Sequence, residues 1–140
     1  MATVINAATL QAYRETHYRV LGDTPMILRV DQASAPLATL HKLLGVACSA
    51  FITAANPFSQ RCDDNANAAR QQALAQDIAR MGLRAIEAAG KHPANGWPAE
   101  PSLLVPGLSL EDARLLGEKY GQNAVVWSGA DAVPRLVLLR

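Results

Sequence analysis

The residues best suited to chemistry include Asn67 and Arg70, near the start of the longest helical pattern in the chain. Leu74, Ile78 and Met81 form the apolar stripe of this pattern at positions i, i+4 and i+7. When the stripe is followed backward, the same helix face passes through Arg70 and Asn67, so both should face the interior. An arginine at a helix N-terminus suits a carboxylate or phosphate. The helix phase therefore predicts a site for a small anionic ligand.

Three more polar residues lie near the ends of predicted strands. A long apolar run leads to Thr53 and then to Asn56, which precedes a proline, and Gln122 lies between a predicted helix and the next strand. Ligands of α/β sheets bind where strands end, so we expect Thr53, Asn56 and Gln122 to orient the ligand together with Asn67. The alternative is purely structural: Asn before Pro is ordinary turn chemistry, and the amide of Gln122 could satisfy the helix end.

Glu100 is the candidate catalytic residue. Its carboxyl group lies between Pro98 and Pro101, close to Trp97 and directly before a predicted strand. A carboxyl group that a rigid loop holds in place can act as a general acid or base. A salt bridge with Arg70 that only fixes the loop is equally consistent with the sequence.

Helices and strands must position these residues, and their pattern along the sequence predicts a single α+β domain over residues 1–140. We expect a mixed sheet of about five strands flanked by three or four helices, with Ser34 and Ser109 as helix caps. Because a helix separates the first two predicted strands, we expect a right-handed parallel crossover between them. The predicted strands cover residues 26–30, 46–54, 84–89, 102–105, 124–127 and 136–139, and the predicted helices cover residues 9–18, 34–44, 64–81 and 109–120.

Composition restricts the class of partner. The formal net charge is +1, which argues against nucleic acid, and no apolar run approaches the roughly 20 residues that a membrane span needs. Cys48 and Cys62, like the three scattered histidines, fit no metal spacing, and no cofactor motif is present. Two thiols and the absence of a basic, apolar leader over residues 1–6 predict a cytoplasmic protein. The sequence makes no prediction of oligomeric state.

Five separated motifs resemble a bacterial family known as domain of unknown function 3293. They are Tyr13-x-x-Thr16-x-Tyr18, Phe51-Ile52-Thr53-Ala54-Ala55-Asn56-Pro57, Asn67-Ala68-Ala69-Arg70, Trp97-Pro98-x-Glu100-Pro101-Ser102 and Gly121-Gln122-Asn123-Ala124-Val125. The resemblance covers nearly the whole chain. The family pattern has Trp in place of Ala55, and Glu in place of Asn65 or Ala66. The resemblance implies that the family's characteristic polar positions are Thr53, Asn56, Asn67, Arg70, Glu100 and Gln122, and it implies no substrate.

Two functional hypotheses follow. In the first, the polar residues line an open site in which Arg70 holds an anionic group and Glu100 supplies acid or base chemistry. In the second, the protein is a non-enzymatic interaction module, and the same residues form an internal network that fixes the fold.

Overall fold

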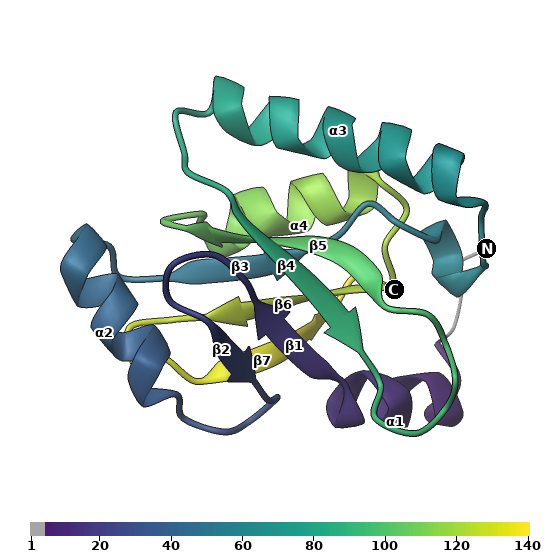
Figure 1. Cartoon of the computed structure of the whole chain (residues 1–140), viewed down its shortest axis with the longest axis horizontal. Coiled ribbons are helices and arrows are strands. Elements are labelled where there is room, and N and C mark those ends of the chain that lie inside the picture. Colours follow the sequence, from purple (N-terminus) through teal and green to yellow (C-terminus); the bar gives the residue numbers. More distant parts are fainter. Residues whose placement is uncertain (1–4) are drawn as a thin grey trace.

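The computed structural model describes residues 5–140 and contains four α-helices and one seven-stranded sheet (Figure 1). Residues 1–4, on which part of the prediction about a leader rests, lie outside the described residues. The strands are β1 (His17–Val20), β2 (Met26–Leu28), β3 (Ser49–Ile52), β4 (Ile86–Lys91), β5 (Glu100–Pro106), β6 (Ala124–Ser128) and β7 (Pro134–Leu138). The helices are α1 (Ala7–Glu15), α2 (Ala35–Leu44), α3 (Asp64–Arg80) and α4 (Leu110–Lys119), with a 3-10 turn η1 (Pro57–Ser59).

Side-chain caps determine where the last three helices begin. Ser34, Asp63 and Ser109 each accept a hydrogen bond from a backbone N–H three residues further along, as N-cap residues do. The predicted caps at Ser34 and Ser109 are therefore confirmed. Within residues 5–140, no helix has the length and apolar character that crossing a membrane requires.

The prediction of a first helix over residues 9–18 is wrong at both ends. Asn6 is the cap, and its side chain accepts the N–H of Thr9 at 2.8 Å. The helix ends at Glu15, and the following residues form β1, in which Tyr18 and Val20 are buried. The alternation of buried and exposed residues in this strand is only four residues long, too short to stand out from a helical pattern.

The α+β class is confirmed, but the sheet has seven strands rather than about five, in the order β2-β1-β4-β5-β3-β6-β7. All neighbouring strands are antiparallel, so the expected mixed sheet and the parallel crossover are wrong. In the sheet, β1, β4 and β5 separate β2 from β3. The apolar run through β3 indicated burial on both faces, which an antiparallel strand between two helical layers satisfies equally well.

The sheet curls, so that the segments next to its two edge strands meet. After β2, the N–H of Asp31 donates to the carbonyl of Pro134 at 2.7 Å, and the N–H of Ser34 donates to that of Ala132 at 3.0 Å. The curl gives the sheet an inner face and an outer face, each covered by helices.

Two apolar cores lie on these two faces. On the outer face, α3 and α4 lie side by side and bury Leu74, Ile78 and Leu116 (Figure 1). On the inner face, α2 buries Leu37 and Leu40. α1 lies over the other end of the inner face, but none of its residues is fully buried. Space therefore remains between α1 and the sheet.

Gly121 allows the end of α4 to approach the turn that follows β3. Its φ is +69°, and an added Cβ would lie 2.9 Å from Cβ of Pro57. At this contact the N–H of Phe58 donates to the carbonyl of Gly121 at 2.7 Å. The two segments therefore touch through their backbones.

We expect Gly121→Ala to lower the free energy of unfolding by about 2–4 kcal/mol, because the left-handed conformation and the crowded contact both oppose a Cβ. Gly82→Ala is the matched control, with φ +74° and no atom within 4 Å of an added Cβ. In the control, only the left-handed backbone conformation opposes the Cβ, so its free energy of unfolding should fall by only about 1–2 kcal/mol. Urea denaturation measures both losses, and equal losses would contradict a role for the contact.

Candidate functional site

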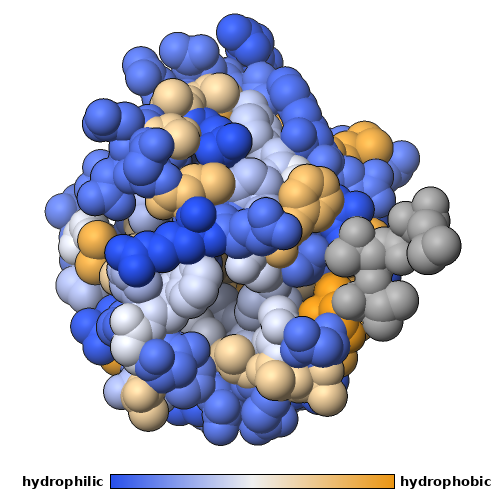
Figure 2. Space-filling model, turned by 90° about the vertical axis from the view of Figure 1, so that its right-hand side faces the viewer, coloured by the Kyte–Doolittle hydropathy of each residue, from blue (hydrophilic) through white to orange (hydrophobic). Residues whose placement is uncertain are grey.

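A cavity of about 390 Å³ lies between α1 and the inner face of the sheet. Figure 2 shows a hollow bordered by residues of intermediate hydropathy, on the side of the molecule where α1 and the loop between β4 and β5 lie in Figure 1. Tyr18 and Phe51 form part of the apolar lining, with ring centroids 5.1 Å apart in an edge-to-face arrangement. Across from α1 lies a set that we call the polar wall, consisting of Thr53, Asn56, Glu100, Ser102 and Gln122.

Asn56 occupies a turn that aims its side chain at the cavity. Its backbone is left-handed, with φ 48° and ψ 59°, a conformation that Asn tolerates better than most residues. Its side-chain oxygen accepts hydrogen bonds from the N–H of Cys62 and from the amide of Asn67, both at 2.9 Å. The backbone N–H of Asn56 donates in return to the side-chain oxygen of Asn67 at 2.9 Å. These bonds hold the Asn56 amide in one orientation.

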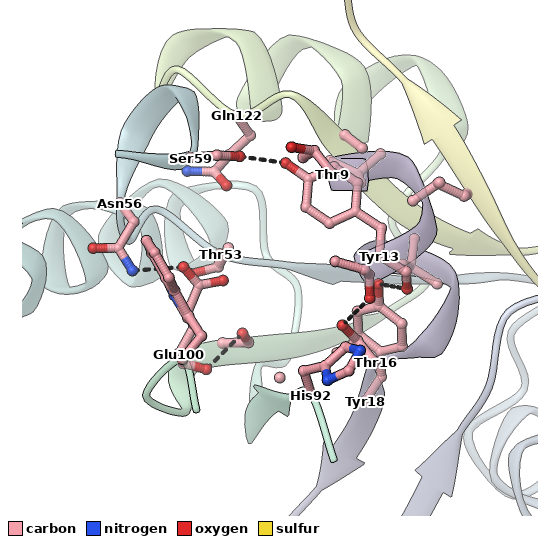
Figure 3. Close-up of a pocket in the computed structure, with 18 of the residues that line it drawn as sticks. Thr9, Tyr13, Thr16, Tyr18, Thr53, Asn56, Ser59, His92, Glu100 and Gln122 are labelled. Carbon is pink, nitrogen blue, oxygen red and sulfur yellow. Dashed lines mark hydrogen bonds between the residues drawn. The ribbon is translucent and has the colours of Figure 1, made fainter. Parts of the chain in front are cut away.

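The remaining polar atom of Asn56 reaches Glu100. The amide nitrogen of Asn56 donates to Oε2 of Glu100 at 2.5 Å (Figure 3). Burial raises the pKa of the Glu100 carboxyl, while hydrogen bonds from Asn56 and Trp97 oppose the rise. The polar wall therefore contains a carboxyl group that takes up a proton more readily than an exposed one does.

Gln122 closes the same wall from the end of α4. It is 8% exposed, and its amide nitrogen donates to the carbonyls of Ala55 at 3.0 Å and Tyr120 at 3.3 Å. These two bonds use both amide hydrogens and leave the carbonyl oxygen Oε1, which is turned toward the cavity in Figure 3. Thr53 is held similarly, since its hydroxyl donates to the carbonyl of Pro101 at 2.7 Å.

The opposite side of the cavity comes from residues that the sequence prediction did not assign to a site. The hydroxyl of Tyr13 in α1 is hydrogen-bonded to that of Ser59, and the amide of Asn123 donates to both, at 3.3 and 2.9 Å. Tyr18 donates its hydroxyl to the carbonyl of Tyr13 at 2.6 Å. The hydroxyl spacing Tyr13-x-x-Thr16-x-Tyr18 is the sequence signal that could have pointed to this wall.

The structure separates Asn67 and Arg70 from the cavity lining. Asn67 faces inward as the helix phase predicted and is 7% exposed, but it serves to hold Asn56. Arg70 is half-buried, and its Nη1 has no hydrogen-bond partner among residues 5–140. The ion pair with Glu100 that the sequence left open as an alternative does not form, since none of the ion pairs within the described residues includes Arg70. Thus Thr53, Asn56, Glu100 and Gln122 converge on the cavity, and Asn67 supports them from behind.

Within residues 5–140, no group of three or more His, Cys, Asp or Glu side chains is arranged to hold a metal ion. His92 lines the cavity mouth, but both of its ring nitrogens are engaged. Its Nδ1 accepts the N–H groups of Ala94 and Asn95 at 3.0 Å, so Nε2 carries the proton and donates to Glu15 at 3.1 Å.

A family model described as protein of unknown function (DUF3293) matches residues 52–125. The chain is therefore a member of this family, and the match includes the whole polar wall. No curated protein and no solved structure matches the chain.

We expect Asn67→Ala to lower the free energy of unfolding by about 2–4 kcal/mol, because the buried backbone N–H of Asn56 would lose its acceptor and its side-chain oxygen would lose one of two donors. Arg70→Ala, one helical turn further along α3, is the control. It removes no ion pair or hydrogen bond and should change stability by less than about 1 kcal/mol. Urea denaturation measures both, and a larger loss for Arg70→Ala would show that the arginine, not Asn67, supports the site.

The raised pKa of Glu100 makes stability depend on pH with a defined sign. The folded protein holds the Glu100 proton to higher pH than the unfolded chain does, so it binds more protons in this window. The contribution of Glu100 is therefore complete below its ordinary pKa of 4.5 and is lost as pH rises through the folded pKa. The difference in unfolding free energy between wild type and Glu100→Gln should decrease across that window in urea titrations at a series of pH values. A difference that rises with pH would contradict the effect of burial.

Proposed function

We propose that the protein binds a small organic molecule in the cavity beneath α1. The observation that supports this proposal is the combination of a cavity of about 390 Å³ with a polar wall at one side, in which Asn56, Ser102 and Gln122 are buried and Thr53 and Glu100 half-buried. Small-molecule sites are mostly apolar concavities of roughly 300–1,000 Å³ with a few well-placed polar groups. Four of the seven aromatic side chains line this one, namely Tyr13, Tyr18, Phe51 and Trp97.

The charge of the lining changes the ligand that we expected from the sequence. The prediction of an anionic, phosphate- or carboxylate-bearing ligand depended on Arg70, and Arg70 does not line the cavity. Glu100 does line it, and a carboxyl group repels an anion when it is ionised. A neutral or cationic molecule fits this lining better.

Glu100 remains our candidate for acid–base chemistry within this site. Its pKa is raised by burial, which brings proton exchange closer to neutral pH. Asn56 holds the carboxyl group in a fixed position. The other residues of the polar wall would orient the ligand. The cytoplasmic location and the bacterial origin that we expected from the sequence remain predictions.

The alternative function is a non-enzymatic interaction module whose polar residues form a structural network. The bonds between Asn56, Asn67 and Cys62 favour it, because they join two parts of the chain without facing the cavity. Under this alternative the partner binds elsewhere, for example near the exposed ring of Phe58. The cavity itself has no role in this alternative, so a variant that fills the cavity distinguishes the two functions.

Blocking the cavity tests the proposal. Ala12 lines the cavity from α1, so Ala12→Phe should fill it. Because α1 contains no fully buried residue, the variant should still fold. Ala7→Phe places the same side chain on the same helix at an exposed position outside the lining and serves as the control.

A thermal-shift screen with small aromatic and aliphatic amines, alcohols, amides and acids should find compounds that stabilise the wild type. At a concentration about 100 times Kd, a bound compound adds about 2.7 kcal/mol to the free energy of unfolding. The same compounds should stabilise Ala7→Phe and fail to stabilise Ala12→Phe. A screen in which every active compound stabilises Ala12→Phe equally would rule out the cavity as the binding site.

A further inference from the structure

We infer that the ligand of this cavity carries an ammonium group or a similar cationic group. This group would donate hydrogen bonds to the carboxyl group of Glu100 and to the side-chain oxygen of Gln122. This inference rests on the proposed function, since it names the chemical class of the molecule bound in the same cavity. It follows from how the hydrogen-bond donors and acceptors around the cavity are used.

The donors of the polar wall already have protein partners. Thr53 donates to the carbonyl of Pro101, Ser102 to that of Glu100, and the Asn56 amide to the Glu100 carboxyl group. The Gln122 amide nitrogen donates to two carbonyls. A ligand that needs donors from this wall would have to compete with these bonds.

Several donors of α1 and of the mouth are used in the same way, although the Thr9 hydroxyl and one hydrogen of the Tyr13–Ser59 hydroxyl pair have no acceptor among residues 5–140. The hydroxyl of Thr16 donates to the carbonyl of Ala12 at 2.7 Å, and that of Tyr18 donates to the carbonyl of Tyr13. The ring N–H of His92 points to Glu15 rather than into the cavity. The Thr16 bond closes the end of α1, and the Tyr18 bond joins α1 to β1, so these donors are not free for a ligand.

Acceptors remain on the polar wall. Oε1 of Gln122 accepts no hydrogen bond from residues 5–140, although the side chain is more than nine-tenths buried. The Glu100 carboxyl group has several lone pairs, and within residues 5–140 it accepts hydrogen bonds from Asn56 and Trp97 alone. Both groups face the cavity in Figure 3. A ligand completes this wall by donating hydrogen bonds to it.

The charge around the cavity favours a cation among the possible donors. None of the lysines and arginines within residues 5–140 lines the cavity, while Glu100 does. The rings of Tyr13, Tyr18, Phe51 and Trp97 present π-faces or edges to the same space, and π-faces attract cations. A charge-assisted bond from an ammonium to a carboxylate is stronger than the neutral bond from a hydroxyl.

Three compounds with one aromatic body test the inference: phenethylammonium, phenethyl alcohol and phenylacetate. Isothermal titration calorimetry with the full chain measures their affinities at near-neutral pH. We expect the ammonium compound to bind about ten-fold or more tightly than the alcohol, and the carboxylate to bind most weakly. Glu100→Gln should remove the preference for the ammonium and keep the affinity for the alcohol. Glu111→Gln removes an exposed carboxylate of α4 and should leave all three affinities unchanged.

A second measurement uses only the wild type. Affinity for phenethylammonium should decrease as pH falls through the pKa of Glu100, because protonation removes the negative charge. Equal binding of ammonium and alcohol at every pH, or tighter binding of phenylacetate, would overturn the inference and leave the proposed cavity function intact. If no compound, including those of the wider screen, binds in a way that Ala12→Phe blocks, the proposed function fails and the inference fails with it.

Discussion

The reciprocal hydrogen bonds between Asn56 and Asn67 are the interaction on which the site depends. They attach the end of the apolar β3 run to the first turns of α3 while Asn56 is in a left-handed conformation. With both its backbone N–H and its side-chain oxygen engaged, Asn56 has only its amide nitrogen left for Glu100. One pair of side chains thus connects a strand end, a helix start and a carboxyl group that lies far away in the chain.

The cavity exists because the helices do not cover the inner face of the curled sheet equally. α2 inserts leucines into one end, whereas α1 covers the other end through hydrogen bonds and buries none of its residues fully. A helix held mainly by Tyr13, Tyr18 and their partners can open at lower cost than one packed into a core. This arrangement leaves a cavity under α1 without disturbing the outer core.

The electrostatics of the cavity follow from what surrounds Glu100. Its closest partners are the neutral amide of Asn56 and the ring of Trp97, and burial raises the pKa of its carboxyl group. A neighbouring arginine would have had the opposite effect on this pKa. Because Arg70 lies outside the lining, Glu100 faces the cavity without a cationic partner from residues 5–140. The cationic ligand that we propose would supply this positive charge.

Local features of the sequence determined the α+β class, the caps at Ser34 and Ser109, the inward phase of Asn67, and the polar residues Thr53, Asn56, Glu100 and Gln122 that line the cavity. The caps and the phase of Asn67 depend on residues within a few turns of one helix, so periodicity and capping are sufficient to predict them. The other polar residues were predicted from their places beside expected strand ends and from the family resemblance. Only the tertiary structure decided the antiparallel pairing, the placement of α1 over the sheet and the separation of Arg70 from Glu100. These depend on strand order and on contacts such as Tyr13 with Ser59 and Asn123, which join residues far apart in the chain. Periodicity carries no information about such contacts, so a charge-based prediction of the ligand could not be made from the sequence alone.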